Sequence, residues 1–389
     1  MQGMKNPMLF AHKAALLLLI VFFTHGCSRD KGEEAPAYDP GKDPVRIGVC
    51  VPEEGISKEY SKKFLDGIRV ASGIMGVIND ARIELGMKDS CDSTDLDTII
   101  EHMVQDGLQG FIIRTGVKTQ SIAAFDAEQG GITVVAAGRS NPDRKPRVFR
   151  LGSSLADQAR AAALFAVRSL KTQRVAVILD QDSSSCILLA SMFSSELINV
   201  GGRIENITYI EDTSEEIESS VISMMQHIPD AVYIPYSEDT TLAAISLAKK
   251  QGVSADMIVS NVMLEQRFLD EGGRDLDGVY LITDFHPGAV QSQRGAALIE
   301  EYEENPKDLG SLETCSALGS EAYFLLCDLL SQPLDDVTDD AVISGGKTIT
   351  GITGMSGSGR ITKSMHACQI RSGIIRGTRT VYKESINPL

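Results

Sequence analysis

Hydrophobic and polar positions follow one repeating order along most of the chain. A short apolar run at residues 45–51 precedes an amphipathic helical pattern at 59–80, and further apolar runs follow at 82–89, 110–115 and 132–137. Helical patterns at 95–107 and 120–129 separate these runs. Strand-like runs that alternate with amphipathic helices predict βαβ units, right-handed crossovers and a parallel sheet.

The pattern restarts after residue 154. A helical pattern at 157–170 leads into strand-like runs at 174–180, 203–210, 231–236, 256–261 and 278–285, with helical patterns between them. Helices at 294–302 and 313–330 and a β segment from about residue 349 complete the chain. The fold class that this order predicts is α/β, with two doubly wound parallel-sheet lobes.

The N-terminus has a different pattern. Two lysines precede an apolar run at residues 14–23, which is too short to span ~30 Å of hydrocarbon and therefore predicts an export signal at 1–26. The run ends in Thr-His-Gly-Cys, which resembles a bacterial lipoprotein signal and implies lipidation of Cys27 as the mature N-terminus; ordinary cleavage nearby is the alternative. Residues 27–43 are polar and charged, as in a tether.

Composition narrows the function classes. The chain has 389 residues, 43% of them hydrophobic, which is enough for two cores. Its formal net charge of −16 argues against nucleic acid or an anionic membrane surface as a partner, because both would repel it.

Motifs for catalysis and metal binding are missing. The cysteines have no CxxC spacing, which gives no support for a zinc site, and their disulfide pairing stays open. SGGKT at 344–348 lacks the first glycine of a phosphate loop, and GSGRIT at 357–362 is typical of a hairpin turn. No HExxH motif occurs. We therefore expect no enzyme activity, no cofactor and no metal.

The strand at 132–137 ends abruptly in a polar loop, Gly138 to Asn141, before Pro142. Ligands of open parallel sheets bind at the carboxyl ends of the strands, so this loop is expected to line a cleft.

Several local sequences, in this order and spacing, resemble the leucine/isoleucine/valine-binding group of type I periplasmic solute-binding proteins, the receptors of ABC importers. The resemblance covers nearly all of the chain from residue 45 to about residue 375, although the last of these sequences lacks the family's Phe-Asp. They are VRIGVCVPEEG (45–55), FLDGIRVA (64–71), KDSCDSTD (88–95), AGRSNPD (137–143), RVFRLGSSLADQARAAALFA (147–166) and GITGMSGSGRI (351–361).

The resemblance implies a two-lobe clamp with three crossovers, a ligand between the lobes, and closure on binding. Lobe 1 would comprise residues 44–148 and 286–348, and lobe 2 residues 149–285 and 349–389. We expect a monomer.

In the family, the first lobe holds a ligand carboxylate through hydroxyl and backbone N–H groups of the loops after the third and fourth strands. The resemblance carries this role to the third-strand loop, with Val117 where the family commonly has serine, and to the fourth-strand loop, where Ser140 would donate a hydroxyl. The alternative for the fourth-strand loop is a turn with a solvated arginine. The expected lobe 1 residues are Gly116, Lys118, Thr119, Gly138, Arg139 and Ser140, with Tyr60 covering the ligand.

The second lobe departs further from the family. Ser184 stands where the family often stacks a tyrosine, and the serines around it are equally typical of a helix start. Asn261 stands where the family often places an acid against the ligand's ammonium, and a neutral amide cannot replace that charge. Glu238 or Asp239 are the alternative acids.

The sequence therefore predicts a lipid-anchored extracytoplasmic protein that binds a small, carboxylate-bearing, amino-acid-like solute and delivers it to an ABC importer permease. The departures at Val117, Ser184 and Asn261 leave a second hypothesis open, an envelope sensory or protein-interaction module with a degenerate pocket.

Overall fold

The computed structural model describes residues 38–52, 58–91, 105, 107–115, 131–138, 147–210, 214–237, 240–260, 262–332, 349–355 and 361–382. The helices predicted at 95–107 and 120–129 lie outside these ranges, apart from residues 105 and 107.

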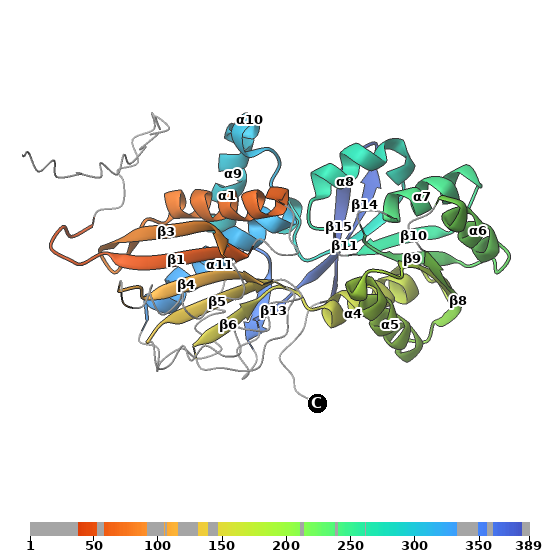
Figure 1. The fold of residues 1–389 in the computed structure, drawn as a ribbon, viewed down its shortest axis with the longest axis horizontal. Helices are drawn as coiled ribbons and strands as arrows, with labels where there is room; N and C mark the ends of the chain where they lie inside the picture. Colours follow the sequence, from red (N-terminus) through yellow and green to blue (C-terminus); the bar gives the residue numbers. More distant parts are fainter. Residues whose placement is uncertain are drawn as a thin grey trace, which may run out of the picture. The chain divides into compact units, whose positions relative to one another are not determined.

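The first sheet has the order β2-β3-β1-β4-β5-β6 (Figure 1). All neighbours are parallel except β2 and β3. Five consecutive residues of β5 are buried, as expected for a strand covered on both faces. The bounds are β1 (Val45–Pro52), β2 (Val77–Ile78), β3 (Ala81–Cys91), β4 (Gly110–Thr115), β5 (Thr133–Gly138) and β6 (Val148–Leu151).

The second sheet has the order β15-β14-β11-β10-β9-β7-β8. Strands β7 to β11 pair in parallel, whereas β14 and β15 are antiparallel. The bounds are β7 (Arg174–Asp180), β8 (Arg203–Ile210), β9 (Ala231–Pro235), β10 (Asp256–Ser260), β11 (Tyr280–Thr283), β14 (Met365–Arg371) and β15 (Ile374–Tyr382).

The predicted α/β class is confirmed, but both sheets are mixed at one edge. For the pairs β14–β15 and β2–β3, the physical reason is the length of the turn. Ser372 and Gly373, both with positive φ, join β14 to β15, and Asn79 and Asp80, also both positive, join β2 to β3. A two-residue turn of this kind can connect only antiparallel strands.

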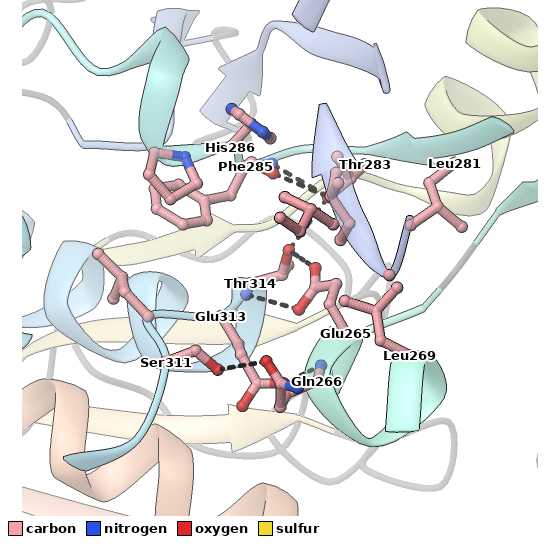
Figure 2. A pocket seen from close by; sticks show the side chains of 15 residues that line it. Glu265, Gln266, Leu269, Leu281, Thr283, Phe285, His286, Ser311, Glu313 and Thr314 are labelled. Carbon is pink, nitrogen blue, oxygen red and sulfur yellow. Dashed lines mark hydrogen bonds between the residues drawn. The ribbon is translucent and has the colours of Figure 1, made fainter. Parts of the chain in front are cut away.

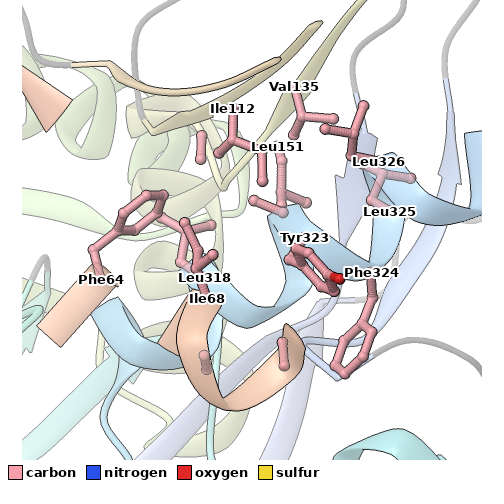
Figure 3. Packing of buried hydrophobic residues seen from close by; sticks show 14 of the residues in the cluster. Phe64, Ile68, Ile112, Val135, Leu151, Leu318, Tyr323, Phe324, Leu325 and Leu326 are labelled. Carbon is pink, nitrogen blue, oxygen red and sulfur yellow. The ribbon is translucent and has the colours of Figure 1, made fainter. Parts of the chain in front are cut away.

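Helices flank both sheets (Figure 1). Helix α11 is buried along almost its whole length and packs against α1, β4 and β5, in agreement with its mostly apolar sequence (Figure 3). The bounds are α1 (Lys58–Ile74), α4 (Leu155–Leu164), α5 (Ser184–Asn199), α6 (Ser214–Met225), α7 (Thr241–Lys250), α8 (Glu265–Gly272), α9 (Gln293–Glu304), α10 (Pro306–Leu309) and α11 (Thr314–Leu330). Five short elements complete the described chain: η2 (Phe165–Ser169), which continues α4 as a π-helix, the 3₁₀ helices η3 (Gly273–Leu276) and η4 (Pro287–Ala289), and the antiparallel strands β12 (Ile352–Met355) and β13 (Ile361–Lys363).

Two glycines set the close approach of α1 and α11. A Cβ at Gly67 would overlap the carbonyl oxygen of Ser316, and a Cβ at Gly319 would overlap that of Phe64. The Ser320 hydroxyl also donates to the carbonyl of Gly67 at 2.8 Å. Backbone contact of this kind requires that neither helix carry a side chain at the crossing point.

Three segments of the described chain link the elements around the first sheet, including the separate two-stranded sheet β12-β13 that contacts β6, to the elements of the second sheet. Crossover 1 runs from β6 through Gly152 and Ser153 to α4, crossover 2 from β11 through Asp284 to α9, and crossover 3 from β13 through Ser364 to β14. Among the described residues, none of the helices combines the length and the apolar composition needed to cross a membrane.

Candidate functional site

The carboxyl ends of the first sheet's central strands lie at one edge. Strands β4 and β5 pair in parallel over their full length, and their last residues, Thr115 and Gly138, are partners. The two predicted binding loops therefore leave the sheet from adjacent positions. The loop residues Gly116, Lys118, Thr119, Arg139 and Ser140 lie outside the described residues, so their roles stay predictions.

Gly138 itself is described. Its φ of 150° is in the region that favours glycine, and its carbonyl oxygen lies where a Cβ at Gly152 would be. The backbone of crossover 1 therefore passes close to Gly138, and the role of Gly138 in solute binding stays a prediction.

Tyr60 lies in the first turn of α1. Its side chain is only 6% exposed, and the guanidinium of Arg114 on β4 lies 4.4 Å from the centre of its ring. This cation–π contact joins the start of α1 to the carboxyl end of β4. That the side chain of Tyr60 covers a bound solute stays a prediction.

In the second sheet, the ends of β7 and β9 are joined by a short hydrogen bond. The Ser237 hydroxyl donates to the Asp180 carboxylate at 2.5 Å, and the same carboxylate accepts the backbone N–H of Ser183 at 3.2 Å. Ser183 in turn caps α5, and Ser184 is its exposed first residue. This capping agrees with the helix-start alternative for the serine run. Glu238, Asn261 and Cys27 lie outside the described residues.

The sequence did not identify a buried polar cluster that joins all three crossovers. Asp284 of crossover 2 accepts the Ser153 hydroxyl of crossover 1 at 3.1 Å and forms an ion pair with Lys363, the last residue of β13 before crossover 3, at 3.3 Å. Gln158 donates to the Ser153 hydroxyl at 3.3 Å. The sequence feature that could have indicated this cluster is Asp284, a charged residue directly after the strand Tyr280–Thr283.

A second missed cluster joins the N-termini of α8 and α11 (Figure 2). Glu265, the first residue of α8, accepts the backbone N–H of Thr314 at 3.0 Å and also accepts its hydroxyl, at the start of α11. Glu313, the N-cap residue of α11, accepts the backbone N–H of Gln266 on α8 at 3.0 Å. Each helix thus supplies a carboxyl group to the free N–H groups of the other.

The two glutamates differ in their charge partners. Glu313 forms an ion pair with Lys63 of α1 at 2.9 Å. Burial, reinforced by the nearby charge of Glu313, raises the pKa of Glu265 to about 8. Glu265 is therefore mostly protonated at neutral pH.

Metal chemistry has no support in the described part of the chain. It contains no group of three or more His, Cys, Asp or Glu side chains arranged to hold a metal ion. The polar clusters described above consist of hydrogen bonds and ion pairs between the crossovers and between two helix N-termini.

Comparison with known structures shows the same fold. The leucine-binding protein of Thermotoga maritima matches with a TM-score of 0.67 and 19% identity, covering 86% of this chain and 97% of its own. A branched-chain amino acid transporter substrate-binding protein from Streptococcus pneumoniae in complex with isoleucine matches with a TM-score of 0.67 and 14% identity, covering 86% and 99%. A solute-binding protein from R. palustris in complex with benzoate matches with a TM-score of 0.62 and 13% identity, covering 86% and 96%.

No curated protein matches the chain by sequence. The family model described as periplasmic binding protein matches residues 44–371, which is most of the chain. This chain belongs to the periplasmic binding protein family.

Proposed function

We propose that this chain is a lipid-tethered receptor outside the cytoplasm that binds a small carboxylate-bearing solute between two lobes and delivers it to the permease of an ABC importer. The observation that carries the proposal is the pairing of Thr115 with Gly138, because it starts the two predicted anion-binding loops from neighbouring strands. Backbone N–H groups and hydroxyls that converge at the carboxyl ends of parallel strands suit an anionic group.

The ligands of the structural relatives support this class of solute. Isoleucine, leucine, benzoate and 4-hydroxybenzoate occur in the solved complexes, and each carries a carboxylate. In this chain, Ser140 and Thr119 offer hydroxyls to a carboxylate, and Arg139 and Lys118 offer charge-assisted hydrogen bonds.

The second lobe decides whether the solute also carries an ammonium group. Asn261 provides no charge for an ammonium, so an amino acid would depend on Glu238 or Asp239 as its acid partner. Solutes without an ammonium, such as aromatic acids, would need no such partner. Asn261 and the acid at position 238 or 239 are therefore expected to determine the choice between amino acids and simple carboxylic acids.

A thermal-melt screen of the chain starting after Cys27 tests the proposal. The compounds are amino acids, short-chain carboxylates, aromatic acids and the corresponding amides, each at millimolar concentration. A ligand at ~100 times its Kd adds about 2.7 kcal/mol to the free energy of unfolding, which raises Tm by a few degrees. We expect this shift with carboxylates, not with their amides, and we expect Ser140→Ala to abolish it.

The matched control is Ser195→Ala, which removes an exposed hydroxyl on α5. This control should keep the full shift. If ligand-free protein, verified by mass spectrometry, shows no shift with any compound, the alternative of a sensory or protein-interaction module with a degenerate pocket is favoured.

The tether is tested separately. Palmitate labelling of expressing cells should label the wild-type chain and should not label Cys27→Ser, which is expected to be released from the membrane fraction. Labelling of Cys27→Ser at the wild-type level would contradict lipidation at this position.

A further inference from the structure

A cavity of about 350 Å³ lies beside the glutamates that join α8 and α11 (Figure 2). This volume is within the ~300–1,000 Å³ range of small-molecule sites. Of the predicted solute-binding residues that the structure describes, namely Tyr60, Gly138 and Ser184, none lines the cavity.

The cavity has an apolar wall and a polar end. Leu269, Leu281, Phe285, Leu312 and Ile375 line the wall. The polar end consists of the carboxyl group of Glu265 and the hydroxyls of Thr283 and Thr314, which lie 3.0 Å apart. At the rim, Ser311 is exposed and Ile374 is 52% exposed, so the cavity opens to solvent.

Glu265 differs from the other buried acids near it. Asp284 has Lys363 as an ion-pair partner and Glu313 has Lys63, whereas no lysine, arginine or histidine lies within ion-pair distance of Glu265 in the described ranges. Glu265 is only 8% exposed. Its two oxygens each accept one hydrogen bond from Thr314, which leaves further lone pairs of the carboxylate open to another donor.

We propose that this cavity binds a small amphipathic primary amine, with the ammonium group hydrogen-bonded to Glu265 and Thr283 and the hydrocarbon chain against Leu269, Leu281 and Ile375. The ammonium would supply the missing positive charge to a buried carboxylate. The apolar wall would remove the hydrocarbon chain from water, at ~25 cal/mol per Å² of buried area.

This inference does not rest on the proposed carboxylate solute. The proposed solute is recognised by its carboxylate and the amine by its ammonium group, and the two sites use different residues. Failure of either binding assay therefore leaves the other assay unaffected.

Binding would be linked to the protonation of Glu265. Its raised pKa of about 8 means that the neutral carboxyl predominates below this pH, and an ammonium must displace the proton. The titratable and charged groups around Glu265 are Glu313 at the N-cap of α11, Cys315 of α11, Cys368 of β14, and His286 of crossover 2, which also lines the cavity; Lys63 of α1 is the ion-pair partner of Glu313.

The link between protonation of Glu265 and amine binding predicts the direction and the size of the change in affinity with pH. The ionised fraction of a group with a pKa of about 8 rises from ~3% at pH 6.5 to ~90% at pH 9, so the apparent affinity for an ammonium should rise about 30-fold. A primary amine, with a pKa near ~10.4, remains mostly charged over this range.

The test is isothermal titration calorimetry of the purified full chain with n-hexylamine at pH 6.5 and pH 9, with 1-hexanol and hexanoate as probes of the same length. We expect hexylamine to bind more tightly at pH 9, and the alcohol and the acid not to bind. Glu265→Gln should remove the binding. Glu271→Gln, which changes an exposed glutamate of the same helix, should not.

Methyl NMR of isoleucine-labelled protein provides a second readout if Glu265→Gln fails to fold. Hexylamine should shift the methyl signals of Ile374 and Ile375 and leave that of Ile198, an exposed isoleucine on α5, unchanged. Binding that persists in folded Glu265→Gln, equal affinity at both pH values, or no binding at millimolar hexylamine would overturn the proposal.

Discussion

Lys363 and Asp284 form an ion pair at 3.3 Å in which the two side chains are only 1% and 7% exposed. Lys363 ends β13 at the entrance to crossover 3, and Asp284 lies in crossover 2. The Ser153 hydroxyl of crossover 1 donates to the same carboxylate oxygen. One carboxylate therefore binds groups from the other two crossovers, and the desolvation of each charge is offset by the other.

Removal of the lysine should destabilise the protein strongly. Lys363→Met breaks the buried ion pair by removing its cation, which typically costs about 3–5 kcal/mol in the free energy of unfolding. Urea denaturation measures this loss. Adding Asp284→Asn to Lys363→Met should recover part of it, because the uncompensated charge is removed.

The matched control for this substitution is Lys42→Met. Lys42 pairs with Asp80 at 3.2 Å, but the two side chains are 47% and 73% exposed, so the cost should stay below ~1 kcal/mol. Equal losses for Lys363→Met and Lys42→Met would show that the buried pair does not stabilise the crossovers.

The glycines between α1 and α11 give a second prediction. Gly67→Ala and Gly319→Ala each place a methyl group on a carbonyl oxygen of the facing helix, and overpacking of this kind costs about 1–3 kcal/mol. Gly73→Ala is the control. Gly73 is exposed near the end of α1, and nothing lies within 4 Å of the added carbon. Since alanine favours helix over glycine by up to ~1 kcal/mol, Gly73→Ala should raise Tm. A rise in Tm for Gly67→Ala would contradict the close packing.

Glu265 predicts a specific dependence of stability on pH. Its pKa is raised to about 8 in the folded chain from an ordinary value near ~4.5, so folding favours the protonated form. The stabilisation is complete below the pKa that Glu265 has in the unfolded state. It is lost as the pH rises through the pKa of Glu265 in the folded state, by an amount of the order of a few kcal/mol. Chemical denaturation at pH 5, 7 and 9 should therefore show that wild type loses more stability than Glu265→Gln. If the free energy of unfolding changes with pH to the same extent in both proteins, the raised pKa of Glu265 is disproved.

Four cysteines are expected to be inert in the folded chain. Cys186, Cys315, Cys327 and Cys368 are buried with free thiols, whereas Cys50 is disulfide-bonded. Burial raises the pKa of Cys327 and of Cys368 to about 12 and also raises that of Cys186 and Cys315, so few thiolates form at pH 8.

Iodoacetamide labelling followed by peptide mass spectrometry checks this expectation. The four peptides should remain unmodified in native buffer and become modified in guanidinium chloride. Fast native labelling of Cys327, which lies on the central helix α11, would show that this helix opens readily.

Most of the order of the described strands and helices was predictable because it depends on local periodicity; the prediction was wrong at β2 (Val77–Ile78), which lies within the residues predicted as helix at 59–80. Buried parallel strands such as β5 and the buried helix α11 differ so clearly in length and pattern that their type is evident in the sequence. The antiparallel edge at β14 and β15 was not predicted, since the Ser372-Gly373 turn was not recognised as a two-residue hairpin connection.

The sequence by itself determined the α/β class, the alternation that brings the two predicted loops to one sheet edge, and the family resemblance. Only the tertiary structure revealed the pairing of Lys363 with Asp284 and the reciprocal capping of α8 and α11, in which Glu265 and Glu313 each accept a backbone N–H group of the other helix. These partners are 79 and about 48 residues apart in the chain. A charged residue in a sequence carries no mark of its distant partner, because burial and pairing arise only when separate segments pack together.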